Sequence, residues 1–323
     1  MTIAEFLALT WLDDGEPLIA PRFPSPILAD PSFLFPSETP DGRWRLFAHD
    51  AFGIRSYDSS DGLSWRDRGM AVPNAMRAFV RKIDGRYALL YEKYRPFALP
   101  LQLLPRRPRW QSRIESRWSD DLACWTKPRR LLEADFPWAR DGRLGESVSN
   151  PCLVPAAGGW RLWFSASLVT IPDCGFDEPR YIGCADAATP EGPFVASAAP
   201  IIGAEGTAAD AMAVGAGSIK VLELDDGWIG LQNRISADRG SSAGSDLHSS
   251  SAIFVLRSTD GTNFRLAREE PLLAPSSGWR ASHVYACDCR RDPASGAWYL
   301  YYNARDGWYK TRGRERIGRI VAR

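Results

Sequence analysis

The sequence lacks three things: an excess of either charge, a long apolar run, and a cluster of metal-ligating residues. Its 40 basic and 39 acidic residues leave a net charge of +1, so neither nucleic acid nor an anionic membrane is expected as a partner. No stretch approaches the roughly 18 apolar residues that a membrane-spanning helix needs. The first residues carry no basic region, and Glu5 interrupts their apolar run, which makes a poor secretory signal. We therefore expect a soluble, cytoplasmic protein.

Cysteine is present, but not in ligand or redox patterns. Of the six cysteines only Cys287 and Cys289 lie close together, and alternate residues of a strand point to opposite faces. No C-x-x-C pair and no Cys/His ligand spacing occurs, so all six are expected to be buried or semi-buried thiols, with a metal or redox role as the alternative. The sequence thus predicts no metal site and no cofactor. Lysine is scarce, because 35 of the 40 basic residues are arginine, and with abundant alanine this indicates a bacterial genome rich in GC.

What the sequence does contain is an internal repeat. Five segments each join a short apolar strand to an aromatic-rich strand through a turn such as Asp41-Gly42 or Asp226-Gly227, which is typical of tight hairpins. The first strands are expected at Ser32–Phe35, Ala78–Arg81, Pro151–Val154, Ser218–Val221 and His283–Ala286. The second strands are expected at Trp44–Asp50, Arg86–Tyr94, Trp160–Ser167, Trp228–Arg234 and Trp298–Asp306.

A polar turn that ends in an aromatic residue follows four of the five second strands. These turns are Ser59–Trp65, Ser119–Trp125, Ala188–Phe194 and Ser258–Phe264. Such a turn joins a third strand to a fourth, which makes four-stranded antiparallel units, and five units predict an all-β, five-bladed β-propeller. We expect one domain of residues 1–323, with blades at 30–73, 74–132, 146–202, 214–275, and 280–323 plus 16–21. A β-sandwich or two stacked β domains is the alternative, but sandwiches rarely repeat a turn motif in this way.

A second repeat suggests how the ring closes. Glu16–Pro21 reads EPLIAP and Glu270–Pro275 reads EPLLAP. The later copy is expected as the fourth strand of the fourth blade, whereas the last blade, which begins at Ser282, has only three strands of its own. We therefore expect residues 16–21 to pair onto the last blade as an N-terminal strand that covers its open edge.

Polar and ionisable residues gather at one end of these strands. If the first strands begin at the top face, the second strands end there and the third strands begin there, in loops long enough to wall a pocket. The residues expected on this face include Asp30, Arg77, Asn150, Ser218, His283, Glu92, Asn303, Arg305, Arg113 and Glu115.

The chain resembles glycoside hydrolase family 43 and related five-bladed glycosidases of the furanosidase superfamily. The resemblance rests on Asp30-Pro31 at the start of the first blade, on the S-x-D-G-x-x-W turns, and on strands such as WRLWFSAS and WYLYYNAR. It implies activity on furanosides and related sugars, with Asp30 as the general base. The family also has carboxylates at the starts of blades three and four, where this sequence has Asn150 and the run Val214–Ser218.

Glycoside hydrolysis uses two carboxylates that flank the scissile bond, roughly 6.5 to 9.5 Å apart for inversion or about 5 Å for retention. One of them must keep its proton near neutral pH, through burial or a like-charged neighbour. We expect Asp30 as the base or nucleophile, Glu146 as the acid and Glu92 as the second candidate for the acid. The plainer alternatives are a turn residue for Asp30, a loop carboxylate for Glu146 and an ion-pair partner of a nearby arginine for Glu92.

Six further residues are expected to orient the hydroxyl groups or a carboxylate of the substrate: Arg77, Arg113, Asn150, His283, Asn303 and Arg305. The number of arginines favours an anionic or otherwise modified sugar. In some members of the family a histidine in the central channel helps to hold a calcium ion or a water molecule, and the resemblance implies such a site near His283. The alternatives are a hydrogen-bonded core histidine for His283 and a local ion pair with Asp306 for Arg305.

The sequence as a whole predicts a glycoside hydrolase that acts on a small carbohydrate in a top-face pocket. The alternative is a non-hydrolytic sugar-binding propeller or a propeller enzyme of another class, such as an isomerase or lyase, and the missing blade-four carboxylate favours it. A third interpretation, a propeller that binds other proteins, predicts an exposed apolar patch on the top face and no deep pocket.

Overall fold

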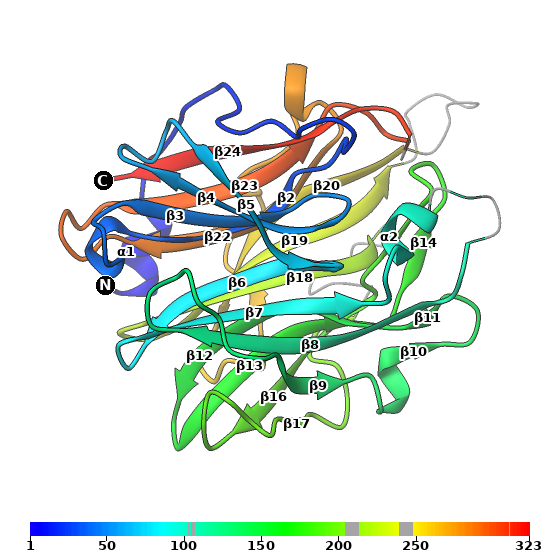
Figure 1. Ribbon diagram of the computed structural model, residues 1–323, viewed down its shortest axis with the longest axis horizontal. Coiled ribbons are helices and arrows are strands. Elements are labelled where there is room, and N and C mark those ends of the chain that lie inside the picture. The colour runs from blue at the N-terminus through cyan, green and yellow to red at the C-terminus, as the bar shows by residue number, and fades with distance from the viewer. Residues whose placement is uncertain (103, 105–106, 204–212, 239–247, 310) are drawn as a thin grey trace.

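The computed structural model describes residues 1–102, 104, 107–203, 213–238, 248–309 and 311–323. It confirms the prediction of an all-β protein, because these residues form several four-stranded antiparallel sheets (Figure 1). Two short α-helices, α1 (Ile3–Leu7) and α2 (Ala98–Leu101), lie outside the sheets. No helix within these ranges is long and apolar enough to cross a lipid bilayer.

The first two sheets follow the chain in simple order. The first sheet contains β2 (Ala29–Leu34), β3 (Trp44–His49), β4 (Gly53–Ser59) and β5 (Arg66–Pro73). The second contains β6 (Ala75–Ile83), β7 (Arg86–Tyr94), β8 (Trp110–Ser119) and β9 (Arg129–Glu133). Its β8 edge is extended by β11 (Gly145–Glu146), which pairs in turn with β10 (Arg140–Asp141).

The rest of the chain repeats this order. The third sheet contains β12 (Val148–Ala156), β13 (Gly159–Ala166), β16 (Tyr181–Ala187) and β17 (Val195–Ala196). A hairpin of β14 (Val169–Ile171) and β15 (Phe176–Glu178) leaves this sheet after β13. The next four strands are β18 (Ala213–Leu224), β19 (Gly227–Asp238), β20 (His248–Ser258) and β21 (Arg265–Leu266). The last are β22 (His283–Arg291), β23 (Trp298–Arg305) and β24 (Glu315–Ala322), with β1 (Trp11–Asp13) on the edge of β24.

The EPLIAP and EPLLAP segments make equivalent contacts. The Leu18 N–H donates to the Ile317 carbonyl at 2.7 Å, and the Leu272 N–H donates to the Ile253 carbonyl at 2.7 Å. The next residue of each segment forms an isolated β-bridge to the same partner, Ile19 to Ile317 and Leu273 to Ile253. The N-terminal segment therefore lies on the last sheet, but the continuous strand there is β1, ahead of residues 16–21. A proline at the second position of each segment cannot donate to a ladder, which keeps the contact short.

The serine–aspartate turns also share one geometry. Ser258 Oγ donates to Asp260 at 2.9 Å, and Asp260 accepts from the backbone N–H groups two and three residues further on. The turns that begin at Ser59 and Ser119 make the same contacts. The indole N–H of Trp163, which belongs to another sheet, donates to the Gly261 carbonyl in the Ser258 turn at 2.9 Å. These turns therefore cap one sheet and bind it to its neighbour.

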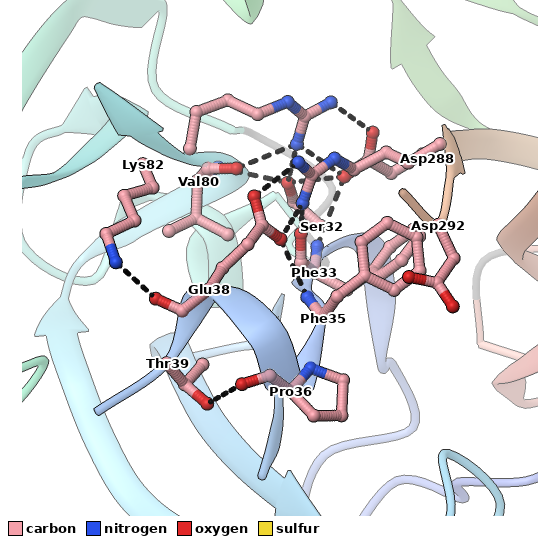
Figure 2. A network of polar contacts seen from close by, with 12 residues as sticks. Ser32, Phe33, Phe35, Pro36, Glu38, Thr39, Val80, Lys82, Asp288 and Asp292 are labelled. Carbon is pink, nitrogen blue, oxygen red and sulfur yellow. Dashed lines mark hydrogen bonds and ion pairs between the residues drawn. The ribbon is translucent and has the colours of Figure 1, made fainter. Parts of the chain in front are cut away.

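A buried ionic cluster joins the first strands β2, β6 and β22, and we call it the Asp288 network (Figure 2). Asp288 has no exposed surface and accepts from both terminal nitrogens of Arg81, at 2.8 and 2.6 Å, and from Ser32 Oγ at 2.8 Å. Beside it, Arg290 donates to both oxygens of Glu38 at 2.6 Å. Because β2 and β22 come from opposite ends of the chain, the network ties the first sheet to the last.

Candidate active site

The first strands of the sheets share an irregularity at the same end. In β2, β6, β12, β18 and β22 the pairing with the second strand slips near its start. Such a bulge leaves a residue unpaired and turns its side chain in a new direction. The residues within these slips that line one common cavity are Asp30, Arg77, Asn150, Gly217, Tyr285 and Ala286.

The backbone at most of these bulges has an uncommon conformation. Asp30, Arg77 and Asn150 have φ angles of 53°, 58° and 50°, in the left-handed region that residues with a Cβ rarely adopt. Gly217, at the equivalent place in β18, has a φ of 64°. Neighbouring sheets hold these segments: Asn303 Oδ1 accepts from the Asp30 N–H at 3.1 Å. Strain that recurs at equivalent positions is typical of residues placed for function.

The bulges open into a cavity of about 160 Å³. It lies at the end of the molecule where α2 and β14 are found, away from the two chain termini (Figure 1). Its polar lining comprises Asp30, His49, Arg77, Gln102, Arg107, Asn150, Asp177, Glu178, Ser218, Asn233, Tyr285, Asn303 and Glu315. Much of the rest of the lining is apolar and includes Pro26, Ile27, Ala51, Met76, Leu99, Pro100, Leu168 and Phe176. Four acids and two arginines therefore face one small space.

Asp30 is held by the second strand of its own sheet. Its Oδ2 lies 3.2 Å from His49 Nδ1, and 16% of its side chain is exposed. Burial lowers the pKa of His49, so the imidazole is neutral at pH 7, and the Arg77 N–H donates to the same Nδ1 at 3.5 Å. Asp30 thus lies against a neutral imidazole and remains accessible from the cavity.

A guanidinium lies beside this carboxylate and is fixed from behind. Arg77 Nη1 donates to Glu92 Oε2 at 2.6 Å, and Trp110 Nε1 donates to Glu92 Oε1 at 2.9 Å. Glu92 has no exposed surface, so both of its oxygens serve to position Arg77. On the cavity side, Arg77 Nη2 lies 3.9 Å from Glu178 Oε2. The charge of Asp30 also acts on Arg77, which places this cation next to both acids.

Glu178, at the end of the β14–β15 hairpin, is an acid with a strongly raised pKa. Burial raises the pKa of Glu178 to about 8; Arg77 opposes the rise, and the like charges of Glu315, Asp30 and Asp177 add to it. A carboxyl group with this pKa keeps its proton at neutral pH. Its side chain is 17% exposed, so a ligand in the cavity can reach that proton.

Glu315 opens β24 and faces the same cavity. Arg305 Nη1 donates to its Oε1 at 3.1 Å, and Asn303 Nδ2 donates to its Oε2 at 3.3 Å. Burial raises the pKa of Glu315, and Arg305 partly offsets the rise. Asn303 therefore bridges Glu315 and the backbone of Asp30, and Arg305 supports Glu315 from a position with no exposed surface.

Two insertions complete the walls of the cavity. The segment with α2 supplies Leu99, and the β14–β15 hairpin supplies Phe176. Arg107 joins them, because its Nη2 donates to Asp177 Oδ1 at 2.6 Å and its Nη1 donates to the Gly175 carbonyl at 3.2 Å. Among the described residues, both arginines that line the cavity are thus in ion pairs: Arg77 with Glu92 behind the wall, and Arg107 with Asp177.

The tip of the hairpin is anchored in a buried polar cluster. Cys174 Sγ lies 3.4 Å from His283 Nε2 and 3.0 Å from Ser249 Oγ, and Ser249 Oγ donates to Asp173 Oδ2 at 3.0 Å. Burial lowers the pKa of His283 to about 4, so its ring is neutral. His283 does not line the cavity; it holds the hairpin that carries Glu178.

The surroundings of His283 do not fit the calcium ion that the resemblance implies. Calcium takes six to eight oxygen ligands, with carboxylates prominent among them. The Nε2 atom of His283 instead faces the thiol of Cys174 and the hydroxyl group of Ser249. Within the described part of the chain, no group of three or more His, Cys, Asp or Glu residues could hold a metal ion.

Of the nine site residues predicted from the sequence, the cavity brings four together: Asp30, Arg77, Asn150 and Asn303. Glu92 and Arg305 do not line the cavity, and their charges are paired with Arg77 and Glu315. His283 does not line it either, and its Nε2 lies against Cys174 and Ser249.

Glu146 and Arg113 lie elsewhere. They line a separate hollow of about 420 Å³, because β11 pairs with the edge of β8 and carries Glu146 away from the bulges. Glu146 is 38% exposed and lies 4.0 Å from Arg140, whereas Arg113 pairs with Glu115 at 2.7 Å. The structure therefore does not bring Glu146 to Asp30.

Glu178, Glu315 and Tyr285 were not predicted from the sequence as site residues. The strand order did place the start of each third strand on the top face, and Glu178 and Glu315 lie just before or at such starts. Tyr285 could not be predicted, because a regular strand from His283 would keep it paired with the second strand. Only the bulge of β22 frees it from that pairing and places it in the cavity lining.

Comparison with solved structures finds this fold among glycoside hydrolases. A structure described as a glycoside hydrolase is similar with a TM-score of 0.68 and 12% identity, over 100% of this chain and 96% of that chain. An N-acetylgalactosamine deacetylase from F. plautii, solved in complex with blood group B trisaccharide, has a TM-score of 0.66 and 12% identity, over 97% and 95% of the two chains. A thermostable family-43 glycoside hydrolase has a TM-score of 0.56 and 12% identity, over 91% and 89%.

These similarities establish the fold, and they confirm the resemblance to glycoside hydrolases at that level. No family model matches the sequence, and no curated protein does either. The activity must therefore be argued from the cavity itself.

Proposed function

We propose that this protein is a glycoside hydrolase that cleaves a small carbohydrate or glycoside in the central cavity of a five-bladed β-propeller, with its ring closed by the N-terminal strand. The observation that carries this proposal is the meeting of Asp30 and Glu178 in one cavity, where Glu178 has a pKa of about 8. Hydrolysis of a glycosidic bond needs one carboxyl group that donates a proton and one carboxylate that acts as base or nucleophile. A carboxyl group whose surroundings raise its pKa to about 8 suits the role of proton donor, and the second carboxyl group in the same cavity is then the base or nucleophile.

The proposed reaction uses only groups of this chain. Glu178 gives its proton to the glycosidic oxygen as the bond to the anomeric carbon breaks. Asp30 either takes a proton from the attacking water or attacks the anomeric carbon itself, and water then releases the sugar. The negative charge left on Glu178 faces Arg77, 3.9 Å away, and a fixed cation placed where charge develops lowers the barrier.

The ion pairs of the cavity revise the expected substrate. An anionic sugar needs a guanidinium that is not already paired, but Arg77 and Arg107 both face carboxylates. We therefore propose a neutral sugar, with its hydroxyl groups bound by the amides of Asn150, Asn233 and Asn303, which line the cavity.

A panel of furanosides and pyranosides, each as the 4-nitrophenyl and the methyl glycoside, tests the two roles. Asp30→Asn should lower kcat/KM on both kinds of substrate. Glu178→Gln should lower it far more on methyl glycosides, because nitrophenolate leaves without a proton whereas methoxide does not. Glu133→Gln, which changes a half-exposed carboxylate paired with Arg130, is the matched control. No turnover of any glycoside would remove the hydrolase assignment, and an unchanged rate for Asp30→Asn would remove Asp30 from the mechanism.

The choice of Glu146 as the acid, made from the sequence, stays a prediction that the same panel tests. Glu146→Gln should leave the difference between methyl and nitrophenyl glycosides unchanged if Glu178 is the acid. A selective loss on methyl glycosides in Glu146→Gln would return the role to Glu146.

A sugar-binding propeller, or a propeller enzyme of another class such as an isomerase or lyase, is the second candidate. Gly217 favours it, because this bulge in β18 offers no carboxylate where the resemblance implies the general acid. Under this alternative, calorimetry would show a sugar binding equally to the wild type and to Glu178→Gln, while no nitrophenol is released.

We also propose that the protein works in the cytoplasm. All six cysteines are free thiols, five of them buried as expected and Cys124 exposed, and thiols persist unpaired in reducing compartments. Fractionation of the source cells tests this, and recovery of the protein from a secreted fraction would overturn it.

A further inference from the structure

Large apolar side chains are exposed along one side of the cavity mouth. Among the described residues Phe23 is 94% exposed, Phe97 67%, Leu104 48%, Phe52 41% and Leu101 39%. Each of them lies within three positions of a residue that lines the cavity. Single exposed apolar residues are ordinary, but a group of them beside a cavity marks a binding surface.

A hydrogen bond joins the segments that carry Phe23 and Phe52. The Ala51 N–H donates to Ser25 Oγ at 3.0 Å. Ser25 lies two positions after Phe23, and Ala51 directly precedes Phe52. The loop before β2 and the loop between β3 and β4 therefore lie side by side, although 26 positions separate the bonded residues.

Asn74 continues the line to α2. Its N–H donates to the Phe52 carbonyl at 2.8 Å, and its Oδ1 accepts from the Phe97 N–H at 3.1 Å. The Leu101 N–H donates to the Phe97 carbonyl at 3.1 Å. The three segments thus form one connected surface, which we call the apolar ridge: Phe23, Phe52, Phe97, Leu101 and Leu104.

The ridge continues into the cavity. Ile27, Ala51, Leu99 and Pro100, which belong to the same segments, line the cavity wall, whereas the bulges carry the polar side chains of Asp30, Arg77 and Asn150. This side of the cavity is therefore apolar at the mouth and polar at the bulges. A ligand with a polar sugar at one end and an apolar group at the other matches this change.

We propose that the apolar ridge binds an alkyl or aryl aglycone of a glycoside whose sugar occupies the cavity. This inference rests on the proposed function for the placing of the sugar, but it requires binding only and no turnover. A lipid membrane, a protein partner or a second copy of the chain would use the exposed ridge and leave the cavity wall out. The continuity of ridge and wall favours the aglycone.

Calorimetry with matched probes tests the proposal. The probes are methyl and n-octyl members of two series, α-L-arabinofuranosides and β-D-glucopyranosides, below the micellar concentration. In at least one series the octyl glycoside should bind the wild type at least about tenfold more tightly than the methyl glycoside, because burying only two of its seven additional methylenes raises affinity by about that factor. The combined variant Phe23→Ser, Phe52→Ser, Phe97→Ser should lose most of this preference.

The control is a combined variant at exposed apolar residues far from the cavity. Leu63 (40% exposed) lies in the turn after β4, and Val195 (74% exposed) lies in β17. Leu63→Ser, Val195→Ser should keep the octyl preference. Because all five changed side chains are exposed, circular dichroism should show both variants folded.

Each contrary result has its own meaning. Equal affinity for octyl and methyl glycosides in both series, or the same loss in the control variant, overturns the proposal. Binding of phosphatidylcholine vesicles, or self-association, that the ridge variant abolishes without any octyl preference in the wild type would assign the ridge to a membrane or to a second copy. An octyl preference without hydrolysis of any glycoside would remove the proposed function and leave the ridge assignment in place.

Discussion

Asp288 is a fully buried carboxylate and Glu178 a partly buried one, and their surroundings give them opposite properties. Asp288 accepts hydrogen bonds from both terminal nitrogens of Arg81 and from the hydroxyl group of Ser32 (Figure 2). Burial alone would raise the pKa of Asp288, but Arg81 brings it below its ordinary value. Glu178 has Arg77 at 3.9 Å and like-charged neighbours, and its pKa is about 8.

The comparison shows that burial alone does not make a carboxyl group reactive. What differs is the supply of donors: Asp288 is ionised because its oxygens are hydrogen-bonded to cations, and Glu178 keeps its proton because it lacks such bonds. The first arrangement fastens strands together, and the second stores a proton at the price of stability. The same change, carboxylate to amide, should therefore have opposite effects at the two sites.

The largest expected effect is on catalysis at Glu178. Glu178→Gln should lower kcat/KM for methyl glycosides by about 10²- to 10⁴-fold, the usual contribution of a general acid. In the wild type kcat/KM should fall as pH rises through about 8, because the acid with that pKa then loses its proton. The pH–rate profile of the variant should lack this alkaline limb, and an unchanged limb would show that another group is the acid.

The next effect concerns stability at Asp288. Asp288→Asn should lower the free energy of unfolding by about 3–5 kcal/mol, because it leaves Arg81 buried without its counter-charge. Urea denaturation measures this loss. Asp186→Asn, which changes a carboxylate that is 59% exposed and paired with Arg161, is the control and should cost less than about 1 kcal/mol. Equal losses in the two variants would contradict the role assigned to the Asp288 network.

The same comparison shows how far the sequence could predict the molecule. The hairpins were predictable, because Gly and Asp turns and aromatic second strands are local signals. Asp30, Arg77, Asn150 and Asn303 were predictable as neighbours, since they lie at ends of strands that meet on one face.

Other parts depend on contacts between distant residues and have no local signal. Asp288 and Arg81 are 207 positions apart. Glu178 reaches the cavity because Cys174, at the tip of its hairpin, packs against His283 and Ser249. Glu146 looked suitable in the sequence, but its strand pairs with the outer edge of the second sheet.

A third effect is the pH dependence of stability at Glu178. Its folded pKa of about 8 lies above the ordinary value of 4.5, so the folded protein binds more protons than the unfolded chain between these pH values. Stability from this group is complete below about pH 4.5 and is lost as pH rises through 8. Glu178→Gln should therefore become more stable relative to the wild type between pH 5 and 9, by at most about 1.4 kcal/mol for each pKa unit of the shift. Melting curves that stay parallel over this range would contradict the raised pKa.

The smallest effect is expected at the ion pair between the two walls of the cavity. Arg107 and Asp177 are 22% and 11% exposed, so Arg107→Gln should cost only about 1 kcal/mol of stability. Arg161→Gln, which breaks a partly exposed pair with Asp186 on the third sheet, should cost about as much and serves as the control.

The two variants should differ in kinetics, because Arg107 also holds the hairpin that carries Glu178. Arg107→Gln should raise KM several-fold and shift the alkaline limb of the pH–rate profile, since Asp177 would then lie unpaired next to Glu178 and its charge would raise the pKa of Glu178 further. Arg161→Gln should leave both KM and the limb in place. If both variants lose stability equally and neither moves the limb, Arg107 fastens the two walls without influencing the acid, and the charges around Glu178 act independently of this ion pair.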